Sequence, residues 1–233
     1  MQFPNAAKGV KKLWVAEILS IIAVVLTVIM AFVFVSNFRT QISDIETAVT
    51  NGTEVVLSDE ALTGAQENAL LATGGLAIAL AVLSLIAFIL SLIGTFQGKK
   101  DEVNFGYAFL IVVIGIVLSI VSSFLKQDSE ITRYVQIVAD VCIAWMNYYV
   151  LLGVAGLALK RGETALHDSA KRASTLVAIG VTAGEMLQLY ATNIRNTNQT
   201  LMIVLTVATG IIEIVAYVYY LILLSRAKKM LAN

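Results

Sequence analysis

Long apolar runs constrain this chain more than any other feature of its sequence. Six segments of about 19 to 27 residues carry no lysine or arginine: 14–36, 70–96, 105–125, 134–159, 173–191 and 201–224. About 20 apolar residues in a helix cross a hydrocarbon core of about 30 Å. Backbone groups in lipid must bond within their own helix, and barrel strands would alternate in polarity. The sequence therefore predicts an all-α polytopic protein with about six transmembrane helices in a single membrane domain, 1–233.

Composition supports this class and excludes others. Hydrophobic residues make up 58% of the chain and charged residues only 14%, whereas soluble domains are about 25% charged. The net charge is zero, which gives no reason to expect a nucleic-acid partner. The single cysteine, Cys142, and single histidine, His167, exclude an internal disulfide, a thiolate metal cluster and any site with two imidazoles. No cofactor or bound metal is predicted, and His167 is expected in a cytoplasmic loop.

Basic residues predict the orientation of the helices. Cytoplasmic connections of membrane proteins are enriched in lysine and arginine. Twelve of the 16 basic residues lie at the termini and alternate connections: Lys8, Lys11, Lys12, Lys99, Lys100, Lys160, Arg161, Lys171, Arg172, Arg226, Lys228 and Lys229. The other side holds Arg39, Lys126, Arg133 and Arg195. Both termini are therefore predicted to be cytoplasmic, in a multi-pass protein of the plasma (cytoplasmic) membrane.

The long connection at residues 37–69 is predicted to be acidic and extracytoplasmic. Within it, Ile42, Ile45 and Val49 recur at helical spacing, so the first helix should continue beyond the membrane. A second helix should begin near Asp59. The acidic residues of this loop are Asp44, Glu46, Glu54, Asp59, Glu60 and Glu67.

Four carboxylates interrupt the apolar runs: Glu17, Asp140, Glu185 and Glu213. An ionised carboxylate at the centre of a membrane helix costs at least about 2.5 to 3.5 kcal/mol. Glu17 is close enough to the cytoplasmic boundary to reach the headgroups. Asp140 and Glu185 are predicted at matching depths, about 9 Å inside the outer boundary, and Glu213 near the midplane. If the three deeper acids converge, they will share protons or a cation; otherwise each is a neutral acid bonded across a helix interface.

Helical spacing gives these acids polar neighbours. Asn147 follows Asp140 by seven residues, and Gln188 follows Glu185 by three. Thr209 and Tyr217 lie four residues before and after Glu213. The candidate binding set is therefore Asp140, Glu185, Glu213, Asn147, Gln188, Thr209 and Tyr217.

Two further patterns bear on packing and binding. Trp145, Tyr148 and Tyr149 lie deeper than an interfacial aromatic belt requires, which favours an aromatic-lined pocket. The motifs Gly94-x-x-x-Gly98 and Gly180-x-x-x-Gly184 predict close helix packing.

No catalytic or nucleotide-binding motif accompanies the acids, so an enzyme is not predicted. The leading hypothesis is a small transport or solute-binding protein with an outward-facing polar cavity, linked to protons or a cation. One alternative is a non-catalytic scaffold or accessory subunit of a larger membrane complex. A second is a membrane sensor that uses the acidic outer loop. The expected partners are the lipid bilayer, a proton or cation, a small solute, and membrane subunits or further copies of this chain.

Overall fold

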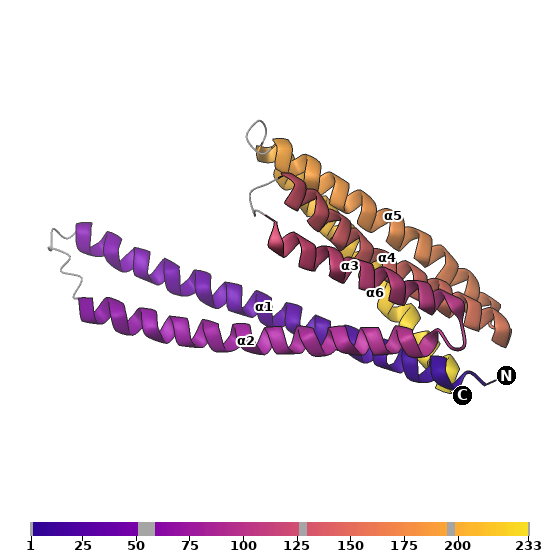
Figure 1. Cartoon of the computed structure of the whole chain (residues 1–233). Coiled ribbons are helices and arrows are strands. Elements are labelled where there is room, and N and C mark those ends of the chain that lie inside the picture. The colour runs from indigo at the N-terminus through magenta and orange to yellow at the C-terminus, as the bar shows by residue number, and fades with distance from the viewer. Residues whose placement is uncertain (1, 51–58, 126–129, 195–198, 233) are drawn as a thin grey trace. The chain divides into compact units, whose positions relative to one another are not determined.

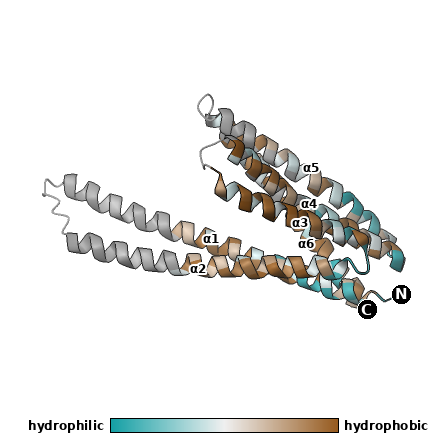
Figure 2. Ribbon diagram, viewed as in Figure 1, coloured by the Kyte–Doolittle hydropathy of each residue, from teal (hydrophilic) through white to brown (hydrophobic). Residues whose placement is uncertain are grey.

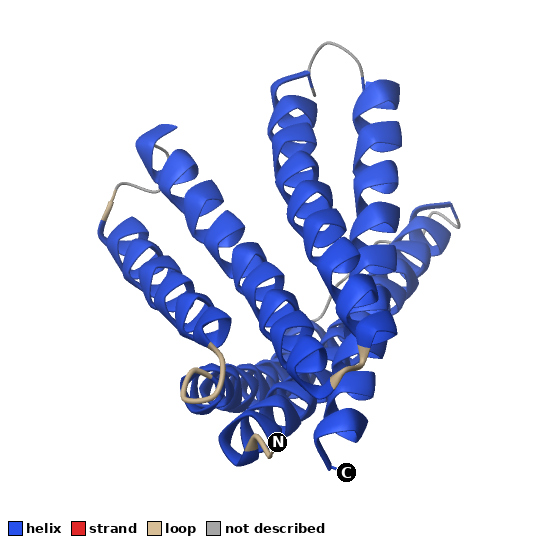
Figure 3. Cartoon of the chain, turned by 90° about the vertical axis from the view of Figure 1, so that its right-hand side faces the viewer, coloured by secondary structure: helices blue, strands red, loops and turns tan. Residues whose placement is uncertain are grey.

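The computed structural model describes residues 2–50, 59–125, 130–194 and 199–232. These residues form helices and short turns, with no strand among them (Figure 3), so the all-α prediction is confirmed. The helices are α1 (Pro4–Thr50), α2 (Asp59–Gly98), α3 (Val103–Phe124), α4 (Glu130–Arg161), α5 (Thr164–Ile194) and α6 (Gln199–Ala232) (Figure 1).

Four helical segments in the described part of the chain are long and apolar enough to cross a membrane: Pro4–Phe32, Gly75–Gly98, Val103–Phe124 and Ile203–Ala232. The predicted spans 134–159 and 173–191 are also helical, as parts of α4 and α5. Their insertion in a bilayer remains a prediction, as does the orientation of the termini.

The first two helices extend well beyond their predicted spans. α1 continues to Thr50 and α2 begins at Asp59, as the spacing of apolar residues and the acidic helix start predict. Much of the predicted outer loop, 37–69, is therefore helical, while residues 51–58 lie outside the described part of the chain.

The chain divides into two compact units, and residues 16–89 form one of them. Its described side chains include few that are buried and many large apolar ones that are exposed, such as Val28 and Phe32 on α1 and Ile78 and Leu85 on α2. Two helices cannot bury apolar residues on all their faces. This surface therefore requires an apolar environment.

The other unit comprises residues 1–15 and 90–233. Within it α3 packs on α4, α4 on α5, and α5 on α6, and α6 also contacts α4. Helices α4, α5 and α6 thus contact one another in all three pairings. Hydrophilic residues gather at the end of this unit that holds both termini (Figure 2), which we call the basic end.

Glycines allow the helices to approach closely at the basic end. The ring of Phe105 is fully buried, and it lies against both Gly98 and Gly153. A Cβ atom built on Gly153 would lie 2.6 Å from this ring, and one on Gly94 would lie 2.9 Å from the carbonyl oxygen of Gly9. These contacts confirm the packing role predicted for Gly94 and Gly98.

The connection between α4 and α5 differs from the prediction. Residues 160–172 were expected to form a loop, but only Gly162 and Glu163 separate the two helices. Gly162 has a φ of +80°, and the Glu163 N–H bonds the Ala158 carbonyl oxygen at 2.9 Å, which is a glycine-dependent helix ending. The first turns of α5 form because they bury Leu166 and Ala170 against the core.

The position predicted for His167 is consequently wrong. His167 lies on α5 rather than in a loop, and its Nδ1 donates a hydrogen bond to the Ala155 carbonyl oxygen at 2.9 Å. This bond ties the start of α5 to the last turns of α4.

Candidate functional site

Among the described members of the predicted set, Asn147 has the features most typical of a ligand-binding residue. It lies on α4 next to the fully buried Val150 and Leu151. Its Oδ1 is buried and accepts no hydrogen bond from any described residue. A buried acceptor left unbonded costs about 1 to 3 kcal/mol. The oxygen is therefore available to a donor such as water, a protonated acid or a solute.

Thr209 and Tyr217 interact with other residues of α6. Thr209 is buried, and its hydroxyl donates within its own helix, 3.1 Å from the Leu205 carbonyl oxygen and 2.9 Å from that of Thr206. Its lone pairs can still accept a bond, but its proton is used locally. The Tyr217 ring stacks on Tyr220 with centroids 6.4 Å apart and packs against the buried core.

The side chains of Asp140, Glu185, Gln188 and Glu213 lie outside the described residues, although their backbone is helical. Whether these acids converge therefore stays a prediction. Their helices nevertheless have defined contacts, because α4, α5 and α6 pack against one another.

One contact fixes the relative heights of α4 and α5. The Trp145 Nε1 donates to Thr182 Oγ1 at 3.4 Å, so these two residues lie at one level of the antiparallel pair. Residue 140 precedes Trp145 by five positions, which is about 7.5 Å along α4. Residue 185 follows Thr182 by three positions, about 4.5 Å in the same direction. Asp140 and Glu185 thus occupy the same level to within one helical turn.

A second contact fixes α6 against α5. A Cβ atom on Gly180 would lie 3.4 Å from Ile212 Cγ2, an ordinary van der Waals contact, so residues 180 and 212 are level. The close packing predicted for Gly180-x-x-x-Gly184 stays a prediction. Glu213 is one residue further toward the basic end. Asn147 lies two residues after Trp145, about 3 Å closer to the basic end than the contact between Trp145 and Thr182. Asn147 and Glu213 therefore share a second level.

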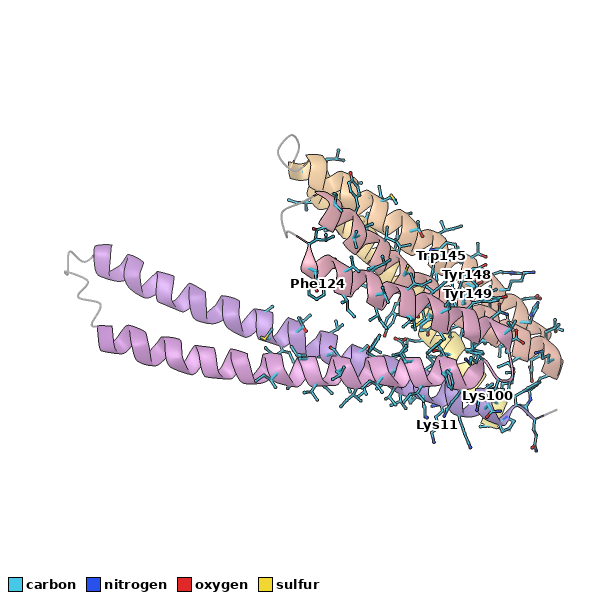
Figure 4. All side chains as sticks on the ribbon, in the orientation of Figure 1. Lys11, Lys100, Phe124, Trp145, Tyr148 and Tyr149 are labelled. Carbon is cyan, nitrogen blue, oxygen red and sulfur yellow. The ribbon has the colours of Figure 1, made fainter. Side chains whose placement is uncertain are left out.

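An aromatic groove runs along α4 and α5. Trp145 and Tyr148 line it from α4, opposite a series of mostly apolar residues on α5, and its volume is about 530 Å³. Trp145, Tyr148 and Tyr149 lie together on α4 (Figure 4), with ring centroids 5.4 Å apart for Trp145 and Tyr148 and 5.0 Å for the two tyrosines. Two of the three predicted aromatic residues, Trp145 and Tyr148, line this groove, whereas the Tyr149 ring also contacts Tyr107, with centroids 5.6 Å apart. The α5 residues of the groove are Thr175, Ala178, Ile179, Thr182, Ala183 and Met186.

A polar cluster at the basic end was not predicted. Glu102 is buried and forms an ion pair with Lys160, with 2.5 Å between Oε2 and Nζ. Asn104 Nδ2 donates to the other carboxylate oxygen at 2.9 Å. Gly156 provides the space, since a Cβ there would lie 2.8 Å from the Glu102 carboxyl carbon. The cluster joins the α2–α3 turn to α4 and its groups are mutually bonded, so it is structural.

The described residues contain no group of three histidine, cysteine, aspartate or glutamate side chains that could hold a metal ion. Comparison of the chain with protein-family models, with curated proteins and with solved structures finds no match.

Proposed function

We propose that this protein is a six-span membrane transporter or solute-binding protein with both termini in the cytoplasm. In this proposal Asp140 and Glu185 hold a proton or cation near the outer side, and Glu213 with Asn147 lines a deeper layer. The observation that supports it best is the pair of helix contacts that puts these positions at two common levels of three mutually packed helices.

The chemistry follows from the low dielectric of the membrane interior. Carboxylates that share one level cannot all be ionised there, because like charges repel strongly and no lysine or arginine lies within the spans. They must share protons or bind a cation, and exchange between these two states couples proton movement to solute movement. The unbonded Asn147 oxygen supplies an acceptor at the deeper level.

The aromatic groove suggests the class of solute to test first. Trp145 and Tyr148 line one wall of the groove, and the faces of such rings attract cations. A lipophilic cation therefore fits both the groove and the neighbouring acids.

The experiment uses the full chain in liposomes that contain a pH-sensitive dye. A pH gradient is imposed, and tetraphenylphosphonium is added as the probe cation. Uptake with dye response is expected, and Asp140→Asn, Glu185→Gln and Glu213→Gln should each lower the rate at least about tenfold, which corresponds to 1.4 kcal/mol. Asp168→Asn is the matched control, because Asp168 is exposed near the start of α5. No response from the wild type, or equal rates in all variants, contradicts the proposal.

An accessory subunit of a larger membrane complex is the second candidate. It is favoured by α6, which exposes neighbouring apolar residues on several faces, among them Ile211, Ile214 and Val215. Purification in mild detergent distinguishes the two functions. A subunit should copurify with a fixed membrane partner, and loss of that partner on changing Ile214 and Val215 to alanine would support this candidate.

A further inference from the structure

A second groove lies at the basic end, between the start of α5 and the end of α6. Its volume is about 380 Å³. It combines charged with apolar walls, since Glu163, Arg226 and Lys229 line it together with Leu166 and Met230. The remaining lining residues are Ala165 and Ser169.

The two basic residues of this groove have no ion-pair partner among the described residues. Other basic side chains nearby are engaged. Lys160 pairs with Glu102, Arg161 donates to the Met230 carbonyl oxygen, and the Lys228 Nζ lies 3.2 Å from the centroid of the Trp14 ring. Arg226 and Lys229 are exposed and retain all their donors for a ligand.

The signs of the charges select the ligand. Two cations on the α6 side suit a phosphate, because guanidinium and ammonium groups are its usual protein donors. A simple phosphate or an anionic headgroup would leave the Glu163 carboxylate in the same groove without a cation. A zwitterion with an ammonium group close to its phosphate would satisfy all three side chains.

The groove also adjoins the end of a candidate membrane span. The segment Ile203–Ala232 is long and apolar enough to cross a bilayer and contains both basic residues in its last turns. Leu166 and Met230 form an apolar wall in the same groove as the charged residues. A molecule with a charged head and acyl chains therefore fits better than a fully soluble one.

We propose that this groove binds the headgroup of an amine-bearing zwitterionic phospholipid. Arg226 and Lys229 hold the phosphate, Glu163 holds the primary ammonium group, and the acyl chains leave past Leu166, away from the basic end. This site is separate from the acids proposed for transport and does not depend on them.

The test is retention of lipid by the full chain. The protein is equilibrated in detergent with equimolar phosphatidylethanolamine, phosphatidylcholine and phosphatidylglycerol of identical acyl chains, then washed, and the bound lipids are counted by native mass spectrometry. Phosphatidylethanolamine should be enriched about fivefold over phosphatidylcholine, because its primary ammonium group can donate a charge-assisted hydrogen bond to Glu163 and the trimethylated ammonium group of choline cannot.

Variants separate the two halves of the headgroup. Glu163→Gln should remove the preference for ethanolamine over choline, whereas the double variant Arg226→Gln with Lys229→Gln should lower retention of all three lipids. Asp168→Asn, in the first turns of α5 but not among the lining residues of the groove, should behave as the wild type. Because every altered side chain is exposed, the helical content and the melting temperature should be unchanged, which circular dichroism checks.

Four outcomes overturn the proposal: no preference for ethanolamine in the wild type, an unchanged preference in Glu163→Gln, unchanged retention in the double variant, or greater enrichment of phosphatidylglycerol. Free phosphoethanolamine is added in a separate arm. If it displaces the lipid at equal concentration, the acyl chains contribute nothing and a soluble zwitterion is the ligand instead.

Discussion

The two ends of the unit built from residues 1–15 and 90–233 are packed in different ways. At the basic end Phe105 is 0% exposed, and its ring is held between two glycines. At the opposite end Phe124, on the same helix, is 85% exposed. The same residue type thus has a protein environment at one end and none at the other. Phe105 is stabilised by contacts within the protein, whereas Phe124 depends on lipid, a solute or another chain for an apolar environment.

The contrast also concerns small residues. Glycines at the basic end meet neighbouring atoms at less than van der Waals distance for an added methyl group, as at Gly98 and Gly153. Gly210, in the half of α6 further from the basic end, has no atom of a described residue within 4 Å of such a group. Close packing in membranes depends on small residues, so the distribution of tight glycines marks where the helices are locked together.

The largest effect is expected from Phe105→Ala. Removal of a fully buried ring should lower the free energy of unfolding by about 3 to 5 kcal/mol. Phe124→Ala is the matched control on α3 and should change it by less than about 0.5 kcal/mol. Unfolding of the detergent-solubilised protein by dodecyl sulfate, followed by circular dichroism, measures both. Equal losses would mean that the two ends are packed alike.

Gly153→Ala should have the next largest effect. The added methyl group would lie against the Phe105 ring, and overpacking of this kind costs about 1 to 3 kcal/mol. Gly210→Ala should instead be neutral or stabilise by up to about 1 kcal/mol, because alanine favours helix more than glycine does. The same unfolding assay applies, and destabilisation by Gly210→Ala would show that an unseen neighbour covers that position.

Glu102→Gln should destabilise the basic end by about 1 to 2 kcal/mol. The change removes a charge-assisted bond from a buried group. The loss of stability is limited because the Lys160 side chain is 45% exposed and its charge is screened by water. A double-mutant cycle with Lys160→Gln isolates the pair. Glu163→Gln, an exposed acid nearby, is the control; a coupling energy near zero would mean that the ion pair does not hold the turn to α4.

Asp101→Asn should have the smallest effect, about 0.5 to 1 kcal/mol. Asp101 Oδ2 accepts a bond from the Ala6 N–H at 2.7 Å, and Oδ1 accepts one from Asn5 Nδ2 at 3.1 Å. Asparagine keeps one acceptor but loses the charge that favours the first turn of α1. Hydrogen exchange at Ala6 measures the change, which should not extend to residues of α3. Unaltered protection at Ala6 would exclude this capping role.

The sequence predicts the local features of this fold well. Apolar run length and helix signals identify the helices, the extension of α1 and the start of α2 at Asp59, because these depend on neighbouring residues. The glycine motifs predict tight contacts, and the depth of Trp145 and Tyr148 predicts an aromatic pocket. Each of these features depends on residues that are close together in the sequence.

Features that depend on tertiary contacts were missed. The short α4–α5 connection exists because Leu166 and Ala170 reach a core that hydropathy does not reveal. The pair of Glu102 and Lys160 joins residues 58 positions apart, and no spacing rule links them. For the candidate site, the residue types and expected depths could be predicted from the sequence, while the heights of α4, α5 and α6 relative to one another required the contacts of Trp145 and Gly180.

The bonds from Asp101 to the start of α1 have a consequence for biosynthesis. The carboxylate lies 95 residues after the backbone N–H that it caps. At a synthesis rate of about 5 to 20 residues per second, the ribosome takes roughly 5 to 19 s to add this distance. The first helix therefore leaves the ribosome, and can enter the translocation machinery, before its amino end can be completed. Asp101 can accept the bond from the Ala6 N–H only when the α2–α3 turn lies beside the start of α1. In a membrane protein, both segments would then be on the same side of the bilayer.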